Sequence, residues 1–262
     1  MSDHVLLTAR EAYAAALESN TLGQNFILLD ETDSTNTRIR ELESDDLAAH
    51  TAVSALRQTA GRGRLGRSWE SEGGGLYLSF GVVTDPQNFA KLPLMAAGAV
   101  IAALDEAGIR DAGIKWPNDI IASNKKICGI LCQAWGRRAA VGIGVNISQT
   151  ADEFARADLP NAASLAMLGY TVDRWTLAAR ILTHADRIWA KIESGAFSQV
   201  LDDYRRRCIS IGRDLIAIAP DREIHGVGTD VDEEGRLVLK TADGFYHVES
   251  GEVKLRSTHG YI

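Results

Sequence analysis

Apolar and polar positions alternate along the chain in a way that separates a long mixed part from a shorter all-β part. Short apolar runs bounded by polar or turn residues predict buried strands. In the first part we expect them at residues 26–29, 51–56, 76–83, 127–135 and 139–147, with a strand, a turn and a second strand over 114–121. Pro117 lies in that turn because proline is excluded from a central strand.

Helical spacing of apolar residues predicts helices over 92–107, 173–192 and 197–208. The first is rich in alanine and ends before Gly108, a residue type typical of helix C-caps. Thr8 and Glu11 have the spacing of a capping box, which predicts that a helix opens there. N-cap residue types at 33–36 predict another helix that ends near Leu47.

The pattern of apolar and polar residues changes at residue 212. Short β-type runs at 215–218, 224–229, 237–240 and 245–248 alternate with turn residues, which is typical of a small antiparallel barrel. The sequence therefore predicts an α+β domain over residues 1–211 and a small β domain over 212–262.

Composition is that of an ordinary globular protein. The 262 residues are 45% hydrophobic and 24% charged. No apolar run approaches the roughly 20 residues that a bilayer helix needs, and the N-terminus does not resemble a signal peptide. Three cysteines, an odd number, argue against a disulfide framework and favour a reducing cytoplasm. A net charge of -7 argues against broad nucleic-acid binding.

One run, RQTAGRGRLGRSW at residues 57–69, places arginines between glycines. Glycine lets a backbone turn and approach a ligand closely, and the guanidinium of arginine matches carboxylate or phosphate oxygens. Trp69 follows at once and could cover a flat ring. Taken alone, the run fits an exposed surface loop as well as it fits an anion clamp.

Three further segments carry polar residues within apolar surroundings: KWPND at 115–119, KICGIL at 126–131 and GIGVN at 142–146. Taken alone, the first is better explained as a tight turn. Strand alternation predicts Lys126, Cys128 and Ile130 on one face of the second segment and Ile127, Gly129 and Leu131 on the other. A glycine within a strand often marks close approach of a ligand.

Other chemistries lack their motifs. The chain contains no G-x-x-x-x-G-K-[ST] phosphate loop, no H-E-x-x-H zinc motif and no G-x-S-x-G elbow. Cys128 and Cys132 fall on one strand face and are expected to be core thiols, because two soft ligands alone do not make a zinc site.

The order DSTN at 33–36, QTAGRGRLGRSW at 58–69, KWPND at 115–119, KICGIL at 126–131 and GIGVN at 142–146 resembles biotin protein ligase along nearly the whole chain. The resemblance implies a central mixed sheet with helices on one side, the class II synthetase-like biotin–lipoate ligase fold. It also implies a small C-terminal SH3-like β-barrel that ends near residues 251–256.

The resemblance further implies an ATP-dependent ligase that acts in two steps. Biotin carboxylate attacks the α-phosphate of ATP to give biotinyl-5'-AMP and pyrophosphate. A lysine of a biotin carboxyl carrier protein then attacks the activated carbonyl, and AMP leaves. Magnesium accompanies ATP without a dedicated site, with Asp119 as its candidate ligand.

Residue roles follow from the same resemblance. The catalytic residues are Arg64 and Lys126. The residues implied for biotin are Ser34, Thr35, Asn36, Gln58, Gly61, Arg62, Gly63, Arg64, Lys126 and Gly129. Those implied for the nucleotide are Arg64, Arg67, Trp69, Lys115, Asn118, Asp119, Asn146 and Arg256, with Arg222 a weaker candidate.

Two alternatives stay open. A lipoate ligase or octanoyl transferase resembles the same fold, although its apolar substrates do not need the polar set at residues 34–36. A regulator that binds the ligand without catalysis is the other. Only about two dozen residues precede the first strand, so we expect no DNA-binding domain and no sequence-specific DNA partner. We expect no membrane partner, and a homodimer is a possible assembly.

Overall fold

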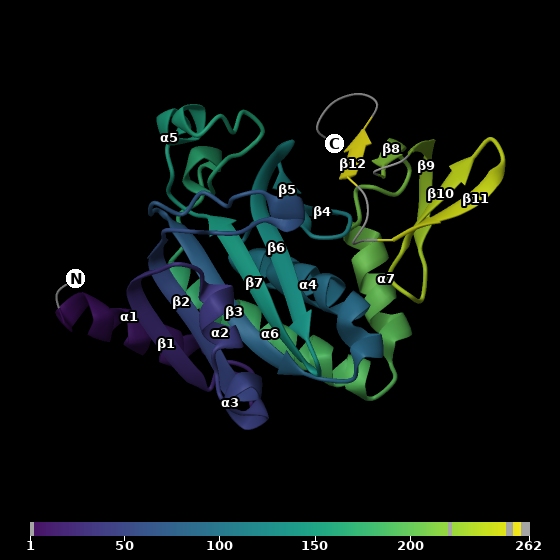
Figure 1. Ribbon diagram of the computed structural model, residues 1–262. Coiled ribbons are helices and arrows are strands. Elements are labelled where there is room, and N and C mark those ends of the chain that lie inside the picture. The colour runs from purple at the N-terminus through teal and green to yellow at the C-terminus, as the bar shows by residue number, and fades with distance from the viewer. Residues whose placement is uncertain (1–2, 220–221, 250–253, 258–262) are drawn as a thin grey trace.

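The computed structural model describes residues 3–219, 222–249 and 254–257. Two sheets organise these residues (Figure 1). The larger sheet has seven strands in the order β1-β2-β3-β7-β6-β5-β4. β1 and β2 run parallel and the other neighbours run antiparallel, so the predicted mixed sheet is confirmed. Its strands are β1 (Asn25–Thr32), β2 (Thr51–Gln58), β3 (Gly75–Val83), β4 (Gly113–Lys115), β5 (Asp119–Ala122), β6 (Lys125–Trp135) and β7 (Arg138–Asn146).

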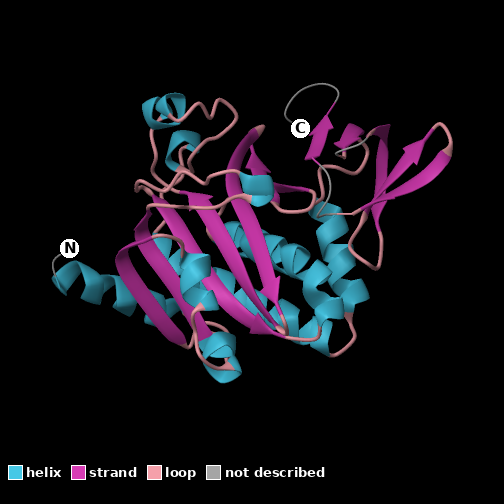
Figure 2. Ribbon diagram, viewed as in Figure 1, coloured by secondary structure: helices cyan, strands magenta, loops and turns pink. Residues whose placement is uncertain are grey.

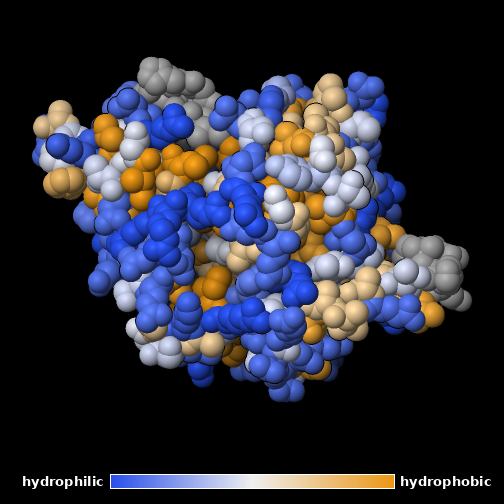
Figure 3. Space-filling model, turned by 180° about the vertical axis from the view of Figure 1, so that it is seen from behind, coloured by the Kyte–Doolittle hydropathy of each residue, from blue (hydrophilic) through white to orange (hydrophobic). Residues whose placement is uncertain are grey.

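Long helices cover one face of this sheet and bury the main core (Figure 2). They are α1 (Asp3–Ala16), α4 (Leu92–Glu106), α6 (Arg174–Glu193) and α7 (Phe197–Arg207). Strand alternation sends Leu78 and Phe80 of β3 into this core, where both are fully buried. Seen from behind, hydrophilic side chains cover much of the surface, and hydrophobic ones show between them (Figure 3).

The stretch Pro86–Glu106 is long and apolar enough, by length and composition, to cross a membrane. It comprises a 3-10 turn (Pro86–Lys91) and α4. Leu94, Val100 and Leu104 of α4 are buried against the sheet and α6. This is the pattern of a core helix, whose apolar residues pack inside the fold.

The opposite face of the sheet carries the short helices α2 (Thr35–Arg40) and α3 (Asp45–His50). Ile39 of α2 packs there with Val53 and Ala140 in a small separate cluster. Most of this face is therefore left free of long helices, and the candidate site lies on it.

The C-terminal part forms a five-stranded antiparallel sheet in the order β11-β10-β9-β8-β12. Its strands are β8 (Asp214–Ile218), β9 (Glu223–Val231), β10 (Leu237–Thr241), β11 (Gly244–Val248) and β12 (Lys254–Ser257). The predicted C-terminal antiparallel β structure is thus confirmed. Residues 220–221, 250–253 and 258–262 of the predicted barrel lie outside the described residues.

Two helix boundaries differ from the prediction. The first helix begins at Asp3, so Thr8 lies inside it and does not cap it. The helix expected from 33 to 47 is two helices, because the Ser44 side chain accepts the Leu47 N–H and begins α3. One further helix, α5 (Ala151–Arg156), was not predicted, although Thr150 and Glu153 form its capping box.

A register shift in β6 overturns the predicted alternation around Lys126. Ile120 of β5 pairs with Cys128, whereas Ile121 pairs with Lys126, so Ile127 is an extra residue. Ile127 and Cys128 both lie in the main core. The bulge therefore turns Lys126 to the same face as Gly129, opposite to the face expected from strict alternation.

Candidate active site

One cleft on the free face of the large sheet gathers most of the segments named from sequence. It lies where the ends of β1 and β2, the arginine-glycine loop, β4, β5 and the glycine-containing stretches of β6 and β7 meet. The residues that line it include Ser34, Thr35, Asn36, Gln58, Arg62, Gly63, Arg64, Arg67, Trp69, Lys115, Asn118, Asp119, Lys126 and Gly129.

One side of the cleft is a network of neutral side chains. The Thr35 N–H and hydroxyl donate to Gln58 Oε1 at 2.8 and 3.1 Å, and Gln58 Nε2 donates to Ser71 Oγ at 2.9 Å. The Ser79 hydroxyl lies 2.7 Å from both Thr35 Oγ1 and Asn36 Oδ1. Four of these residues, Thr35, Asn36, Ser71 and Ser79, are buried. Each side chain is therefore held by another, which fixes the shape of this side.

Asn36 extends the network across the sheet. Its Nδ2 donates to Gln133 Oε1 of β6 at 2.9 Å and to the Leu131 carbonyl at 3.3 Å. A Cβ added at Gly142 of β7 would lie 2.4 Å from Asn36 Oδ1. Gly142 therefore leaves the space that the Asn36 amide occupies.

The floor of the cleft is a pair of glycines on neighbouring strands. Gly129 of β6 and Gly144 of β7 are cross-strand partners. A Cβ at either position would lie within 2.7 Å of the Trp69 ring. The two glycines thus form a flat floor on which the indole rests. The indole Nε1–H of Trp69 is buried and has no hydrogen-bond acceptor among the described residues.

The arginine-glycine run forms an ordered hairpin. Trp69 N–H donates to the Gly61 carbonyl at 2.9 Å, and Gly63 N–H donates to the Arg67 carbonyl at 2.7 Å. The tip carries Leu65 and Gly66 in the left-handed region, with φ of 55° and 73°. Glycine accepts that conformation freely, so the run folds back sharply and returns Trp69 to the floor.

The other side of the cleft carries two cations. Arg64 Nη1 donates to Asn118 Oδ1 at 2.7 Å, and Lys126 Nζ lies 2.7 Å from Asp119 Oδ1. The Lys126 ammonium also lies 5.4 Å from the centroid of the Trp69 ring. Asn118 is fixed in turn, because its Nδ2 donates to the Ile130 carbonyl at 2.8 Å. Adjacent residues of the KWPND segment therefore hold both cations.

Burial affects the ionisable groups near the cleft in two ways. It lowers the pKa of the Arg64 guanidinium, and the nearby Asp119 carboxylate opposes that shift. Arginine nevertheless remains charged. Burial raises the pKa of the Cys132 thiol to about 12 and that of Cys208 to about 11. All three thiols are free, and Cys128 and Cys132 pack in or against the core as expected.

Some residues named from sequence lie beside the cleft or outside it. Gly61 supports the loop, since a Cβ there would lie 2.4 Å from the Trp69 carbonyl oxygen. Asn146 Nδ2 donates to the carbonyls of Lys126 and Ala163, at 3.3 and 3.1 Å, and so holds the end of β7. Arg222 donates to the Tyr246 hydroxyl at 3.0 Å. The side chain of Arg256 lies outside the described residues.

Several residues of the site were not singled out from sequence. Ser79 of β3 and Gln133 of β6 lie outside every motif segment, and only their place on the site face of the sheet could have marked them. Trp116 also lines the cleft from the KWPND segment. Among the described residues, no group of three or more histidine, cysteine, aspartate or glutamate residues is placed to hold a metal ion.

Two family descriptions match the chain. Residues 28–149 match the biotin/lipoate A/B protein ligase family, and residues 210–256 match the biotin protein ligase C terminal domain. The bifunctional ligase/repressor BirA of Bacillus subtilis is 31% identical over 248 residues, which are 91% of this chain and 76% of that protein.

Further biotin ligases are similar to this chain in sequence or structure. The biotin--[acetyl-CoA-carboxylase] ligase of Mycobacterium tuberculosis is 35% identical over 210 residues, 76% of each chain. The structure of biotin protein ligase from Aquifex aeolicus in complex with biotin and ATP superposes with a TM-score of 0.79 at 31% identity and covers 90% of this chain and 100% of its own. This chain belongs to the biotin/lipoate A/B protein ligase family, within which it is a biotin protein ligase.

Proposed function

We propose that the cleft activates biotin with ATP to form biotinyl-5'-AMP and then transfers biotin to a lysine of a biotin carboxyl carrier protein. The observation that carries this proposal is the pairing of a neutral hydrogen-bonding network with a group of cations, Arg64 and Lys126 among them, in one cleft. A ureido ring needs neutral donors and acceptors, whereas a carboxylate and a phosphate need positive charge. The named relatives bind or act on these same substrates.

The neutral side takes the ureido head of biotin. Ser34, Thr35, Asn36 and Gln58 supply its donors and acceptors, and Gly129 leaves room for the rings. Backbone groups of Gly61, Arg62 and Gly63 close the pocket from the loop. Because the network is already ordered, little conformational entropy is lost when biotin binds.

The cationic side takes the reacting groups. A biotin carboxylate oxygen bonds to the α-phosphorus, and the bond from that phosphorus to pyrophosphate breaks. Arg64 and Lys126 stabilise the negative charge that gathers there, and preorganised charge of this kind usually contributes more to catalysis than any other effect. Arg67, Lys115, Asn118, Asp119, Asn146 and Arg256 serve the nucleotide. Magnesium accompanies ATP in this proposal, with Asp119 as its candidate ligand.

The hairpin loop covers the nucleotide, with Trp69 against adenine. The mixed anhydride of biotinyl-5'-AMP reacts with water, so a cover that excludes solvent protects it. The unpaired indole Nε1–H of Trp69 fits this role, because a ligand acceptor would relieve the cost of a buried donor.

In the second step the carrier lysine attacks the activated carbonyl, an amide bond forms, and AMP leaves. We assign the chemistry to residues 1–211 and a supporting role to residues 212–262. A cytoplasmic location fits the three free cysteines. Assembly as a homodimer and the absence of a DNA partner stay predictions.

The test is incubation with ATP, magnesium, labelled biotin and a carrier domain. We expect pyrophosphate release that depends on biotin, and label on one lysine of the carrier. Release triggered by lipoate or octanoate in place of biotin would instead identify the alternative ligase. Binding of biotin with no release from any acid would identify a regulator without catalysis.

A further inference from the structure

The KWPND segment is held in place from the C-terminal part of the chain. The indole Nε1–H of Trp116 donates to the Gly235 carbonyl at 3.0 Å, and both groups are buried. Trp116 N–H donates to Ser210 Oγ at 3.1 Å, and the Tyr204 hydroxyl donates to the Pro117 carbonyl at 3.2 Å. Gly235 belongs to the turn between β9 and β10, far from Trp116 in sequence.

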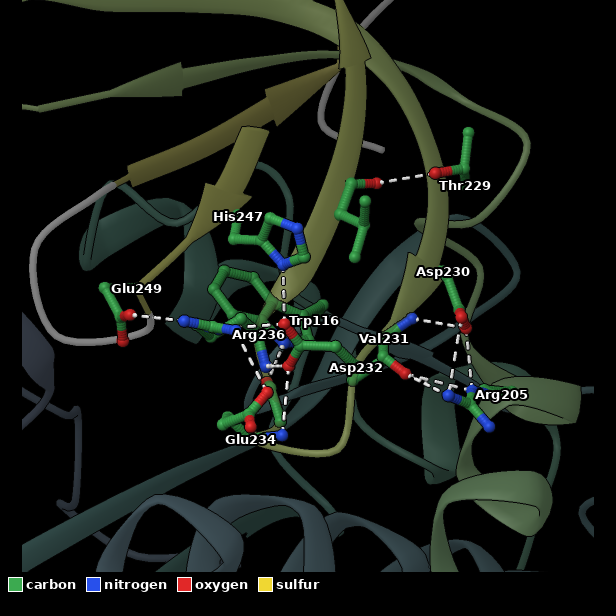
Figure 4. Close-up of polar contacts among 12 residues, drawn as sticks. Trp116, Arg205, Thr229, Asp230, Val231, Asp232, Glu234, Arg236, His247 and Glu249 are labelled. Carbon is green, nitrogen blue, oxygen red and sulfur yellow. Dashed lines mark hydrogen bonds and ion pairs between the residues drawn. The ribbon is translucent and has the colours of Figure 1, made fainter. Parts of the chain in front are cut away.

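Hydrogen bonds and ion pairs of the Asp232 carboxylate stabilise that turn (Figure 4). Asp232 Oδ1 accepts the N–H groups of Glu234 and Arg236 at 3.1 and 2.9 Å. Asp232 Oδ2 accepts Arg236 Nε at 2.8 Å and lies 2.7 Å from His247 Nδ1. One carboxylate therefore ties together the turn and strand β11. The Gly235 carbonyl is consequently presented to Trp116 from a rigid frame.

The turn also rests on the large domain. Gly235 has a φ of 81°, and a Cβ added there would lie 3.4 Å from Leu94 of α4. Glycine permits the left-handed backbone, and the turn lies in ordinary van der Waals contact with α4. The position of its carbonyl is thus fixed from both sides.

On the other side of Trp116 lie the residues that hold the two cations of the cleft. Asn118 accepts from Arg64, and Asp119 pairs with Lys126. Only Pro117 separates Trp116 from Asn118 in the chain. A shift of the Trp116 ring therefore moves the groups that orient Arg64 and Lys126.

We propose that Trp116 is a positioning residue for adenylation, through which the Asp232 turn of the C-terminal sheet sets the place of Asn118 and Asp119. This inference rests on the proposed function. The C-terminal sheet then acts on the reaction through the buried hydrogen bond between Trp116 and Gly235. Misplacing the cations raises the barrier of the chemical step, because catalysis requires them at the reacting phosphate.

The first test replaces Trp116 with phenylalanine, which keeps an aromatic ring and removes the donor. We expect the kcat of biotinyl-5'-AMP formation to fall about 3- to 10-fold, the value of one hydrogen bond. The KM for biotin should stay within about twofold, because the neutral network that binds it lies on α2, β2 and β3. Trp189→Phe is the matched control, since Trp189 is a buried core tryptophan remote from the cleft.

The second test uses Asp232→Asn, alone and with Trp116→Phe. Asn keeps the shape and loses the charged contacts to Arg236 and His247, so we expect kcat to fall about threefold. If Asp232 acts through Trp116, the double variant should be no slower than Trp116→Phe alone. This arm also decides the question if Trp116→Phe fails to fold, because Asp232→Asn alone should lower kcat at constant KM for biotin.

Three results would overturn the inference: an unchanged kcat in both single variants, losses that multiply in the double variant, or a KM for biotin that rises as much as kcat falls. Each presupposes a wild-type protein that releases pyrophosphate with biotin. A wild-type protein without that release would instead contradict the proposed function itself.

Discussion

On the side of α2 and β2, the cleft is lined by neutral side chains that bond to one another, whereas on the side of β5 and β6 it is lined by cations held by neighbouring polar groups. Thr35, Gln58 and Ser79 share hydrogen bonds of 2.7 to 3.1 Å and contain no ionisable group. Lys126 and Asp119 form an ion pair whose side chains are 23% and 19% exposed.

The two sides differ in how readily their groups change partner. In a buried neutral network the side chains already satisfy one another's hydrogen bonds. The network therefore keeps one shape and selects a ligand that fits this shape. Removing one partner of a largely buried ion pair is costly, so Lys126 can leave Asp119 only when an incoming anion takes its place. The cleft thus combines a fixed recognition side with an exchangeable reacting side. Substitutions on one side should therefore change binding, and those on the other side should change the chemical step.

The largest effect is expected on the reacting side. Lys126→Ala removes a positive charge that we propose acts at the phosphate, and it should lower the rate of biotinyl-5'-AMP formation by about 10²- to 10³-fold. Biotin affinity should fall much less, because the neutral side is untouched. Stopped-flow measurement of adenylate formation, with equilibrium binding of biotin, checks both.

Lys125→Ala is the matched control, because Lys125 Nζ donates to the Pro160 carbonyl at the exposed start of β6. It should form adenylate at the wild-type rate. A folded Lys126→Ala protein that also keeps the wild-type rate would remove the reacting role from this residue.

Arg64→Gly tests whether the loop retains the intermediate. The variant loses the charged hydrogen bond to Asn118 and the guanidinium that we propose for the phosphate. We expect biotinyl-5'-AMP to dissociate about 10- to 100-fold faster, from the roughly 1.5–3 kcal/mol of a charged hydrogen bond. Release of labelled adenylate during a chase with unlabelled biotin measures this rate. Arg57→Ala, which removes an exposed partner of Glu31, should leave it unchanged, and equal rates in all three proteins would count against a retaining loop.

Gly142→Ala tests the recognition side. Its Cβ would lie 2.4 Å from Asn36 Oδ1, and the amide cannot yield without breaking its bonds to Ser79 and Gln133. Overpacking costs about 1–2 kcal/mol, so the KM for biotin should rise about 5- to 30-fold. The kcat should change less.

Gly98→Ala, within α4, is the control for that substitution. Its Cβ would lie 3.4 Å from Ile188, which is an ordinary van der Waals contact. Alanine favours a helix, so this variant should be as stable as the wild type or more so. If Gly142→Ala instead lowered kcat and left KM unchanged, the division of the cleft into two sides would be wrong.

The sequence predicts the main elements and the motif segments of the cleft, but it does not predict the contacts that support them. The strands and the long helices follow from local periodicity, and the motif segments do meet in one cleft. The bulge at Ile127 could not be predicted, because it depends on how β6 pairs with β5. Strict alternation would have pointed Lys126 into the core.

The partners of the motif residues were hidden for a similar reason. Ser79 and Gln133 lie in strands outside the motif segments, and their contacts with Asn36 exist only once β3, β6 and α2 are assembled. Trp116 and Gly235 lie in different parts of the chain, and nothing local in either segment indicates their hydrogen bond. Local pattern predicts elements, whereas the supporting contacts of a site are tertiary.

The smallest effect is expected at Asp33, the charged residue beside the neutral side. Its pKa is lowered from the ordinary value: burial opposes the shift, and hydrogen bonds from Ser34 and Thr32 and the charge of Arg38 outweigh it. A depressed folded-state pKa means that Asp33 stabilises the fold above the usual carboxyl range and that this contribution is lost as the pH falls through the depressed value. Because the carboxylate is 39% exposed, solvent screening limits the contribution to about 0.5 kcal/mol. Urea unfolding should therefore show Asp33→Asn slightly less stable than wild type near pH 7. The difference should shrink as the pH falls below the usual carboxyl range. A difference that does not shrink in acid would mean that the side chain acts through its shape and not its charge.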